Sequence, residues 1–528
     1  MAPSEPEDEE ENVRAIDAAL ELAGLECGDA ERLQMRETLA IQRRVAGRRR
    51  AVSLPNELPP ALGFDPGAPP PAAPARLARS AGKRPFPERD EDLAFASVAD
   101  LSRWIEAREL TSLRLTELYL ERLRRLGPGL ACVATVTEER ALAQAARADR
   151  ELASGRYRGP LHGIPYGAKD LLDTAGIETA WGAPPYRGRV PDRDAVAISR
   201  MREAGAVLVA KLSLGALALG DLWYGGRTRN PWRPEQGSSG SSAGSASATA
   251  AGLVGFSLGS ETLGSIVEPS LVCGATGLRP SFGRVPRTGA MALAWSLDKL
   301  GPIARGAEDT ALVLAALCGA DAGDPSSREA PFVFDAAAPV AGLRVGFDPA
   351  WFAPEASHPA ERDALEALRS AGAELVEVRL PDLPYESVVL QIQVEAAAAF
   401  EELTRSGRLG DLPGQELHDW PNVLRSAWLL PAVEYVQLLR IRRLVMDAMA
   451  ALFAGVDAVL ASRAGGAMNL ATNASGHPAL ALRAGFRDDG TPVGVLLFGR
   501  LFEEGSLVRL GMALERELGV FERRPAFG

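Results

Sequence analysis

The pattern of apolar and polar positions divides the chain into an N-terminal helical part and a longer part with mixed periodicity. Residues 13–50 have apolar positions at helical spacing in two runs. Asp29 is a candidate N-cap of the second helix, which we expect to end near Gly47. Proline is frequent after this point, and such a composition predicts an extended connector. We therefore expect a helical arm over residues 1–53 and a proline-rich connector over residues 54–92.

From about Leu93 onward, segments with strand character alternate with segments of helical periodicity. We expect helices over residues 97–107, 111–126, 137–154, 195–205, 363–371, 433–453 and 504–518. We expect strands over residues 131–136, 207–210, 343–347, 375–378 and 456–460, a short strand and turn over 163–170, and two strands flanking a turn at 488–490. This alternation predicts an α/β domain over residues 93–528, with a mixed sheet covered by helices on both faces.

An unusual stretch of small residues lies near the middle of this domain. From Gly237 to Gly252 the sequence is GSSGSSAGSASATAAG, a composition typical of flexible linkers. However, it runs directly into the apolar, strand-like run 253–258. We therefore expect a tight loop over 237–242 and a buried helix over 243–251, because small side chains let a helix approach another backbone closely. Such a loop gathers hydroxyl and N–H groups, which suits an anion, an oxyanion or a proton relay.

Composition excludes several classes of function. The net charge is −11 and the pI about 5.2, which disfavours nucleic acid and anionic membrane surfaces as partners. The chain begins with an acidic, apolar-poor segment and has no apolar run of transmembrane length, so we expect a cytoplasmic protein. No CxxC pair occurs, and we expect buried thiols rather than a zinc or redox site at the four cysteines, Cys27, Cys132, Cys273 and Cys318.

Lysine is rare in this chain. Of the 58 basic residues, only four are lysines, namely Lys83, Lys169, Lys211 and Lys299. Arginine does not lose its proton in a protein, whereas lysine can, so lysine is expected where a neutral amine is needed. We interpret Lys169 in this way. Lys211 and Lys299 are expected to be structural, and Lys83 lies in a polar linker.

Three chemistries could use the serine-rich loop. A phosphate-binding loop requires GxxxxGK[ST], and no lysine follows here. A G-x-S-x-G nucleophile elbow occurs around Ser242 and again around Ser257, with His477 as the candidate base. Chance matches to this pattern are expected in a sequence so rich in glycine and serine. The third chemistry activates a serine by a neutral lysine, directly or through another hydroxyl, and needs no histidine.

Three motifs in order favour the third chemistry. They are HGIPYGAKD at 162–170, the serine-rich stretch, and GSETLGSI at 259–266. Together they resemble the amidase signature family, whose usual forms are G-[IV]-P-x-x-x-K-D, G-G-S-S-G-G-S and G-T-D-x-G-G-S-I-R-x-P. Further matches lie at 228–232, 273–285, 296–302 and 473–500, so the resemblance covers about residues 95–525.

The resemblance implies a site and a reaction. The family's nucleophile corresponds to Ser265, its bridging serine, normally held by a cis peptide, to Ser241, and its lysine to Lys169, with Ser242 in a supporting position. The oxyanion hole would be formed by backbone N–H groups of Thr262, Leu263, Gly264 and Ser265. The resemblance implies hydrolysis of a small-molecule amide through an acyl-enzyme on Ser265, without metal or cofactor. It leaves open a homodimer.

The chain departs from the family pattern around this site. Leu263 replaces a glycine, Glu261 replaces an aspartate, and Val267, with Glu268 beside it, replaces an arginine. The family's T-P-T-x-P is absent, and residues 461–464 stand there. We expect these changes to affect substrate choice more than the catalytic residues. Asp298 is expected to support a loop. Two alternatives stay open: a glutaminase subunit of a transamidating complex, and a ligand-binding homologue without activity.

Overall fold

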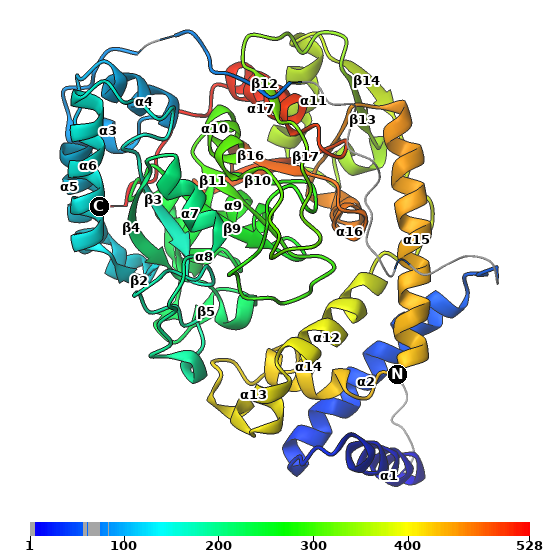
Figure 1. Ribbon diagram of the computed structural model, residues 1–528. Helices are drawn as coiled ribbons and strands as arrows, with labels where there is room; N and C mark the ends of the chain where they lie inside the picture. The colour runs from blue at the N-terminus through cyan, green and yellow to red at the C-terminus, as the bar shows by residue number, and fades with distance from the viewer. Residues whose placement is uncertain (1–5, 56–60, 62–73, 83, 528) are drawn as a thin grey trace.

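A large mixed sheet forms the centre of the molecule. The computed structural model describes residues 6–55, 61, 74–82 and 84–527. Eleven strands form one sheet, with helices around it (Figure 1). In spatial order they are β14 (Glu374–Glu377), β13 (Arg344–Phe347), β15 (Ala458–Ala461), β17 (Pro492–Gly499), β16 (Ala479–Phe486), β10 (Thr276–Arg279), β11 (Lys299–Ala304), β9 (Phe256–Glu261), β3 (Pro165–Lys169), β4 (Val207–Leu212) and β2 (Val133–Val136).

Strand direction changes along this sheet. The pairs β14–β13, β13–β15, β9–β3 and β3–β4 are parallel, and the remaining neighbours are antiparallel. The predicted mixed α/β sheet is therefore confirmed. The strand predicted from the apolar run 253–258 begins three residues later, at Phe256, and continues to Glu261.

Helices pack on both faces of the sheet. In β17, a Cβ at Gly494 would meet Leu271 of α9, whereas a Cβ at Gly499, on the opposite face, would meet Leu507 of α17. α8 packs beside α9, and α10 and α11 pack beside α17. The helices of this domain are α3 (Asp90–Ala94), α4 (Val98–Glu106), α5 (Ser112–Leu130), α6 (Glu138–Ala153), α7 (Val196–Glu203), α8 (Ala243–Ala250), α9 (Val267–Cys273), α10 (Ala307–Leu317), α11 (Pro359–Ser370), α16 (Gly466–Ser475) and α17 (Glu504–Leu518).

Two predicted helix starts are confirmed by their caps. The hydroxyl of Ser97 accepts a hydrogen bond from the Asp100 N–H at the start of α4, and that of Thr111 accepts one from the Arg114 N–H at the start of α5. α5 extends to Leu130, four residues beyond the predicted end.

Short strands pair outside the main sheet: β1 (Arg76–Ala78) with β12 (Val333–Asp335), β5 (Leu222–Trp223) with β6 (Gly226–Arg227), and β7 (Arg229–Asn230) with β8 (Arg233–Gly237).

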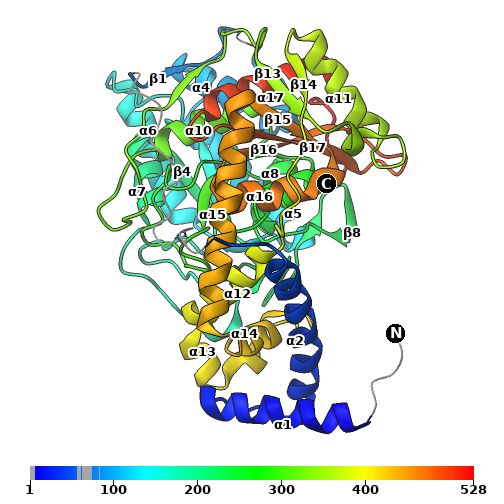
Figure 2. The ribbon, with the colours of Figure 1, turned by 90° about the vertical axis from the view of Figure 1, so that its right-hand side faces the viewer.

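The N-terminal arm packs against a second group of helices away from the sheet. α2 (Asp29–Arg50) lies beside the lower part of α15, with α1 (Pro6–Ala23) across its end (Figure 2). The contacted helices are α12 (Ser387–Ala399), α14 (Trp420–Ala427) and α15 (Ala432–Gly455), with α13 (Glu401–Arg405) nearby. Arg49 forms an ion pair of 2.5 Å with Glu434 of α15, and the Asn422 amide of α14 donates to Thr38. The arm is thus fixed to the body by buried polar contacts.

The boundaries of α2 differ from the prediction. Asp29 is the first helical residue rather than the N-cap, because Gly28 occupies the cap position and its N–H donates to the Glu31 carboxylate at 2.7 Å. The helix also continues through Gly47 to Arg50. Residues 56–60, 62–73 and 83 of the predicted connector lie outside the described residues, and the division into arm, connector and domain remains a prediction. In the part of the chain that the structure describes, no helix has the length and apolar character needed to cross a membrane.

α8, formed by the small-residue stretch, is buried along its whole length. Its Gly244 lies so close to a neighbouring segment that a Cβ there would collide with the Cys132 carbonyl and lie 2.6 Å from the Ser213 nitrogen. The predicted loop and buried helix are therefore confirmed. The small side chains let α8 approach the backbone at the ends of β2 and β4.

A pair of glycine substitutions tests this packing. Gly244→Ala places a methyl group against backbone atoms and is expected to destabilise the fold by about 1–3 kcal/mol. Gly47→Ala, within α2, meets nothing within 4 Å and is expected to be neutral or to stabilise by up to about 1 kcal/mol. Urea unfolding of both variants measures the difference. Equal stability of the two would contradict the close approach of α8.

Candidate active site

The lysine and serine motifs meet at one end of three neighbouring elements. Lys169 is the last residue of β3, Ser260 lies near the end of the adjacent parallel strand β9, and Ser242 occupies the N-cap position of α8. Because β3 and β9 run in the same direction, their carboxyl ends lie at the same edge of the sheet. The serine loop closes over this edge from the start of α8.

The Lys169 amine is surrounded by hydroxyl groups. Its Nζ lies 2.8 Å from Ser241 Oγ, 3.0 Å from Ser242 Oγ and 2.9 Å from Ser260 Oγ. The peptide bond before Ser241 is cis, and the side chains of Lys169, Ser241 and Ser242 are all buried. Burial lowers the pKa of Lys169 to about 7, against a partial opposing effect of the Asp298 and Glu261 charges. The structure thus brings three of the predicted site residues into contact.

Ser260 is a neighbour of this amine that the motif comparison did not single out. Its backbone N–H donates to Ser242 Oγ at 3.2 Å, and its carbonyl accepts from the same hydroxyl at 3.1 Å. The signal in the sequence was its place at the end of an apolar strand, next to Glu261. Only the pairing of β3 with β9 shows that its side chain reaches Lys169.

A second buried lysine lies nearby but has a different environment. Lys211, on β4, forms an ion pair with Asp170 at 3.0 Å and contacts Thr179 Oγ1 at 2.7 Å. Asp170 therefore pairs with Lys211 and not with the adjacent Lys169. Within the described residues, no carboxylate oxygen lies within 4.0 Å of Lys169 Nζ, so this amine is buried without an ion-pair partner.

Ser265 lies beside the serine loop. The Ser242 N–H donates to the Ser265 carbonyl at 3.0 Å, which ties the two motifs together. The Ser265 side chain is half-buried, and its hydroxyl has no hydrogen-bond partner among the residues that the structure describes. Among the described residues, no side-chain hydrogen bond joins Ser265 to Ser241, and the hydrogen bond between the two segments is the backbone one from Ser242 to Ser265.

The loop before Ser265 has free N–H groups. Over the described part of the chain, the N–H groups of residues 262–265 donate to no protein acceptor. The next two N–H groups, of Ile266 and Val267, both donate to one carboxylate oxygen of Glu261, at 2.9 and 3.0 Å. Glu261 therefore holds the end of the loop and leaves the four preceding N–H groups available to an anion.

A buried ion pair fixes Glu261. Arg279 of β10 donates to the Glu261 carboxylate at 2.7 Å, and Asn473 donates to the same oxygen at 3.0 Å. Burial alone would raise the pKa of Glu261, but the charges of Arg279 and Lys299 outweigh it and lower the pKa to about 2. Arg279 also donates to Asn469, Thr472 and the His477 carbonyl. Val267 stands at the end of this loop where the family has an arginine. In this chain Arg279, on another strand, supplies a positive charge that binds Glu261.

The leucine in the loop is compatible with its backbone. The residue with positive φ is Gly264, at +93°, where a Cβ would lie 3.0 Å from the Glu268 side chain. Leu263 does not have a positive φ and packs its half-buried side chain against the main core. The loss of a glycine at position 263 therefore leaves the loop conformation accessible.

A cavity of about 440 Å³ opens beside this loop. Ser260, Thr262 and Asp298 line it on the side of the lysine and serine motifs. Asp298 accepts hydrogen bonds from the Thr262 hydroxyl at 2.6 Å and from two backbone N–H groups at 2.8 and 3.0 Å. Its predicted role in supporting a loop is confirmed, and that loop is joined to the segment before Ser265.

The nucleophile-elbow alternative lacks its base. Ser257 is buried and bonded to Thr249 and to the Ser245 carbonyl. The His477 ring lies 2.9 Å from Ser475, and burial, with the nearby Arg279 charge, lowers its pKa to about 3. In the described residues, no hydrogen bond joins His477 to Ser242 or Ser257.

The four cysteines are free thiols. Cys132 and Cys273 are buried, as predicted, whereas Cys27 and Cys318 are only partly buried. Across the residues that the structure describes, no group of three or more histidine, cysteine, aspartate or glutamate side chains is arranged to hold a metal ion.

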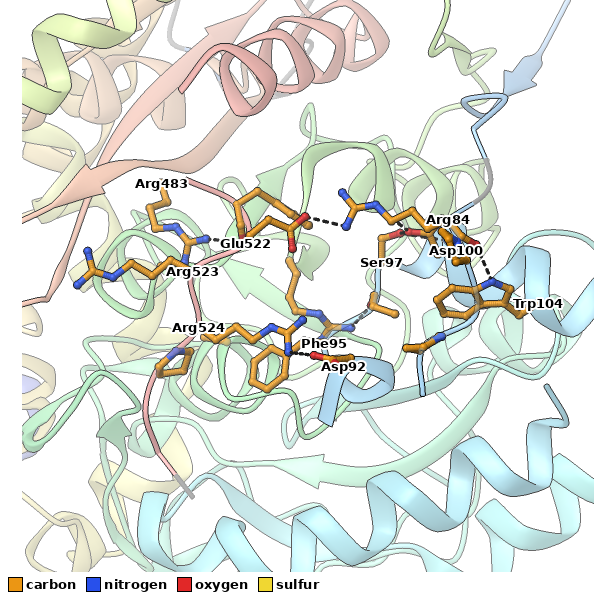
Figure 3. A pocket seen from close by; sticks show the side chains of 18 residues that line it. Arg84, Asp92, Phe95, Ser97, Asp100, Trp104, Arg483, Glu522, Arg523 and Arg524 are labelled. Atoms are coloured by element: carbon orange, nitrogen blue, oxygen red, sulfur yellow. Dashed lines mark hydrogen bonds and ion pairs between the residues drawn. The ribbon is translucent and has the colours of Figure 1, made fainter. Parts of the chain in front are cut away.

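A separate pocket of about 140 Å³ lies at the other end of α8, where Ala250 contributes to its wall. Its charged side chains pair across two chain segments: Arg84 with Glu522 and Arg524 with Asp92, each at 2.7 Å (Figure 3). These contacts fasten the C-terminal segment to the start of the domain. Because these charged side chains are used in internal ion pairs, the arrangement favours a structural role for this pocket.

Comparisons with known proteins agree with this arrangement. The family model described as Amidase matches residues 114–464. A putative amidase AmiD of Mycobacterium tuberculosis (strain ATCC 25618 / H37Rv) is 37% identical over 473 residues, which cover 83% of this chain and 98% of that protein. A glutamyl-tRNA(Gln) amidotransferase subunit from Roseiflexus sp. (strain RS-1) is 34% identical over 466 residues, covering 79% of this chain and 95% of that protein.

A solved structure has the same fold. The native peptide amidase from Stenotrophomonas maltophilia matches with a TM-score of 0.70 and 31% identity, covering 82% of this chain and 98% of that one. The family match spans the lysine motif, the serine loop and Ser265, and the fold carries these segments in one place. The chain therefore belongs to the amidase signature family and is a hydrolase of carbon–nitrogen amide bonds.

Proposed function

We propose that the protein hydrolyses a small-molecule carboxamide through a Ser265–Ser241–Lys169 proton relay and an acyl-enzyme on Ser265. Ser265 Oγ attacks the amide carbonyl while its proton passes to Ser241 Oγ, which gives its own proton to Lys169 Nζ. The carbon–nitrogen bond then breaks, and the proton returns along the relay to the leaving amine. Water, deprotonated by the same relay, attacks the acyl-enzyme and releases the carboxylic acid.

The observation that carries this proposal is the burial of Lys169 among hydroxyls without an ion-pair partner. A buried amine without a counter-ion favours its neutral form, and a neutral amine can accept a proton. The distance of 2.8 Å to Ser241 Oγ is a hydrogen-bond distance, suited to transfer. The amine then donates hydrogen bonds to the Ser242 and Ser260 hydroxyls, so that its lone pair can face the Ser241 hydroxyl.

The loop over residues 262–265 supports the second half of the proposal. Four N–H groups without protein acceptors are suited to stabilise the oxyanion that develops on the substrate carbonyl oxygen. Each well-placed donor of this kind contributes roughly 3–4 kcal/mol to the transition state. The half-buried Ser265 hydroxyl belongs to the same loop, so nucleophile and donors keep a fixed relation.

A second function is the glutaminase step of a transamidating complex. The observation that favours it is the 34% identity to a glutamyl-tRNA(Gln) amidotransferase subunit. That function needs a partner enzyme to receive ammonia. Affinity purification from the source cells distinguishes the two functions. A stoichiometric partner with ammonia-dependent activity would support the glutaminase. An active chain without partners would support the independent amidase. Fluorophosphonate labelling distinguishes both of these enzymes from a ligand-binding homologue without activity.

The nucleophile is tested with a fluorophosphonate probe. The wild type should be labelled on Ser265, and Ser265→Ala should lose both labelling and turnover, because the bond to phosphorus forms at this hydroxyl. Ser257→Ala is the matched control and should keep both. Loss of labelling in Ser257→Ala with retention in Ser265→Ala would instead support the nucleophile elbow, and an unlabelled wild type would favour the inactive homologue.

The pH dependence tests the base. Because the reactive form of Lys169 is neutral and its pKa is lowered to about 7, kcat/KM should rise about tenfold per pH unit below pH 7 and level off above it. An acid limb that continues to pH 10 would show a lysine with its ordinary pKa.

Lys169→Ala should reduce kcat on the order of 10⁴-fold, with folding checked by circular dichroism. Full turnover by this variant would contradict the relay.

The Glu261–Arg279 pair is tested by a double-mutant cycle. Arg279→Met leaves the Glu261 carboxylate buried without its charge partner and should destabilise the protein by about 3–5 kcal/mol in urea unfolding. Adding Glu261→Gln removes the orphaned charge and should recover part of this loss. A double variant no more stable than Arg279→Met would show that the pair does not hold the loop in the way described.

A further inference from the structure

The cavity beside the loop has an apolar wall. Its volume of about 440 Å³ lies in the range of small-molecule sites. Trp295, whose side chain is half exposed, lies on its rim. The buried apolar side chains that line it are those of Leu171, Ala218, Met291, Leu293 and Leu300.

The charged groups of the same cavity are already paired within the protein. Arg287 donates to both carboxylate oxygens of Asp324, at 3.1 and 3.2 Å, and to the Trp295 carbonyl and the Ser326 hydroxyl, each at 2.6 Å. Asp324 also accepts from the Arg287 N–H and from Ser326. The third charged group, Asp298, is occupied by Thr262 and two backbone N–H groups. Among the described lining residues, no charged side chain lacks a partner.

The chemistry of a substrate in this cavity follows from these two features. A carboxylate or ammonium placed there would lose water and find no free opposite charge, because each charged lining group would have to break existing hydrogen bonds. An alkyl or aryl group would instead gain burial against leucine and methionine side chains. The cavity reaches Ser260 and Thr262, so a group that fills it lies next to the reacting carbonyl.

We infer that the enzyme acts on neutral carboxamides with an apolar group that occupies this cavity, and discriminates against amides whose remaining part is charged. This inference rests on the proposed function, because it assigns the cavity to the substrate of the Ser265 site. It separates the chain from an enzyme whose substrate is free glutamine. Met291 and Trp295 are then specificity-determining residues for the amide's apolar group.

Two amides that differ only in the groups on one branched carbon test the inference. In 4-methylpentanamide, two methyl groups stand where L-glutamine has its ammonium and carboxylate. Wild-type kcat/KM should be roughly 100-fold or more higher for 4-methylpentanamide, since burying charges without partners against this apolar wall costs at least this much. Equal or higher kcat/KM for L-glutamine would overturn the inference.

Variants of the wall locate the effect. Met291→Gln keeps the size of the side chain but adds a polar group, and should lower the ratio of kcat/KM for 4-methylpentanamide to that for acetamide about tenfold. Acetamide lacks the group that fills the cavity, so it reports the reaction itself. Trp295→Ala, at an exposed position with little risk to folding, should lower the same ratio, whereas Val333→Ala on β12, outside the cavity, should leave it unchanged. An unchanged ratio in both cavity variants would overturn the inference.

Labelling separates the two possible failures. If fluorophosphonate labels Ser265 and the enzyme prefers charged amides, the inference is wrong and the proposed function stands. If the wild type is neither labelled nor active on any of the three amides, the proposed function fails, and the inference fails with it.

Discussion

The site depends on one constraint, the burial of a lysine amine without a counter-ion. Two buried lysines lie on adjacent strands of the sheet, Lys169 on β3 and Lys211 on β4, and the residue after Lys169 is a carboxylate, Asp170. It pairs with Lys211 at 3.0 Å, which leaves Lys169 to the hydroxyls of the serine loop. Had Asp170 paired with Lys169, the amine would be held protonated and could not accept a proton. The Lys211–Asp170 ion pair therefore uses the carboxylate that follows Lys169 in the sequence, and leaves the Lys169 amine to the serine hydroxyls.

The second element of the site is the set of contacts that hold the loop over residues 262–265. Glu261 accepts the two N–H groups that end the loop and is itself bound by Arg279 and Asn473, from two other parts of the chain. These contacts leave the preceding four N–H groups without protein acceptors. On the other side, Asp298 joins Thr262 to the wall of the cavity. Loop and cavity are thus held by carboxylates whose hydrogen bonds are used internally, which fits a substrate that brings no charge of its own.

Much of this arrangement could be predicted from the sequence, and the rest could not for definite physical reasons. The order of motifs predicted that Lys169 and Ser241 meet, and the small side chains predicted a buried α8. The partner of Glu261 is Arg279, whose other contacts lie some 190 residues further along, and only the folded sheet brings these together. The same holds for Ser260, whose contact with Lys169 depends on the pairing of two strands.

The errors at α2 arise from contacts that a local pattern does not contain. Asp29 has the composition of a cap, but Glu31 reaches back to the N–H of Gly28 and makes Gly28 the cap residue. The glycine at 47 was expected to end the helix, yet Arg49 and Arg50 bind Glu434, nearly 400 residues away in the sequence. The long-range ion pairs extend the helix past the glycine.

The near absence of lysine has a consequence for chemical probing. Lys169, Lys211 and Lys299 are all buried, and Lys83 lies outside the described residues. Reagents that acylate amines therefore meet, within the described structure, no lysine at the surface of the folded protein. Modification at any of these three positions would report an opening of the central sheet. Mass spectrometry after brief acylation would therefore measure the rate of local unfolding around the edge of the sheet where Lys169 lies.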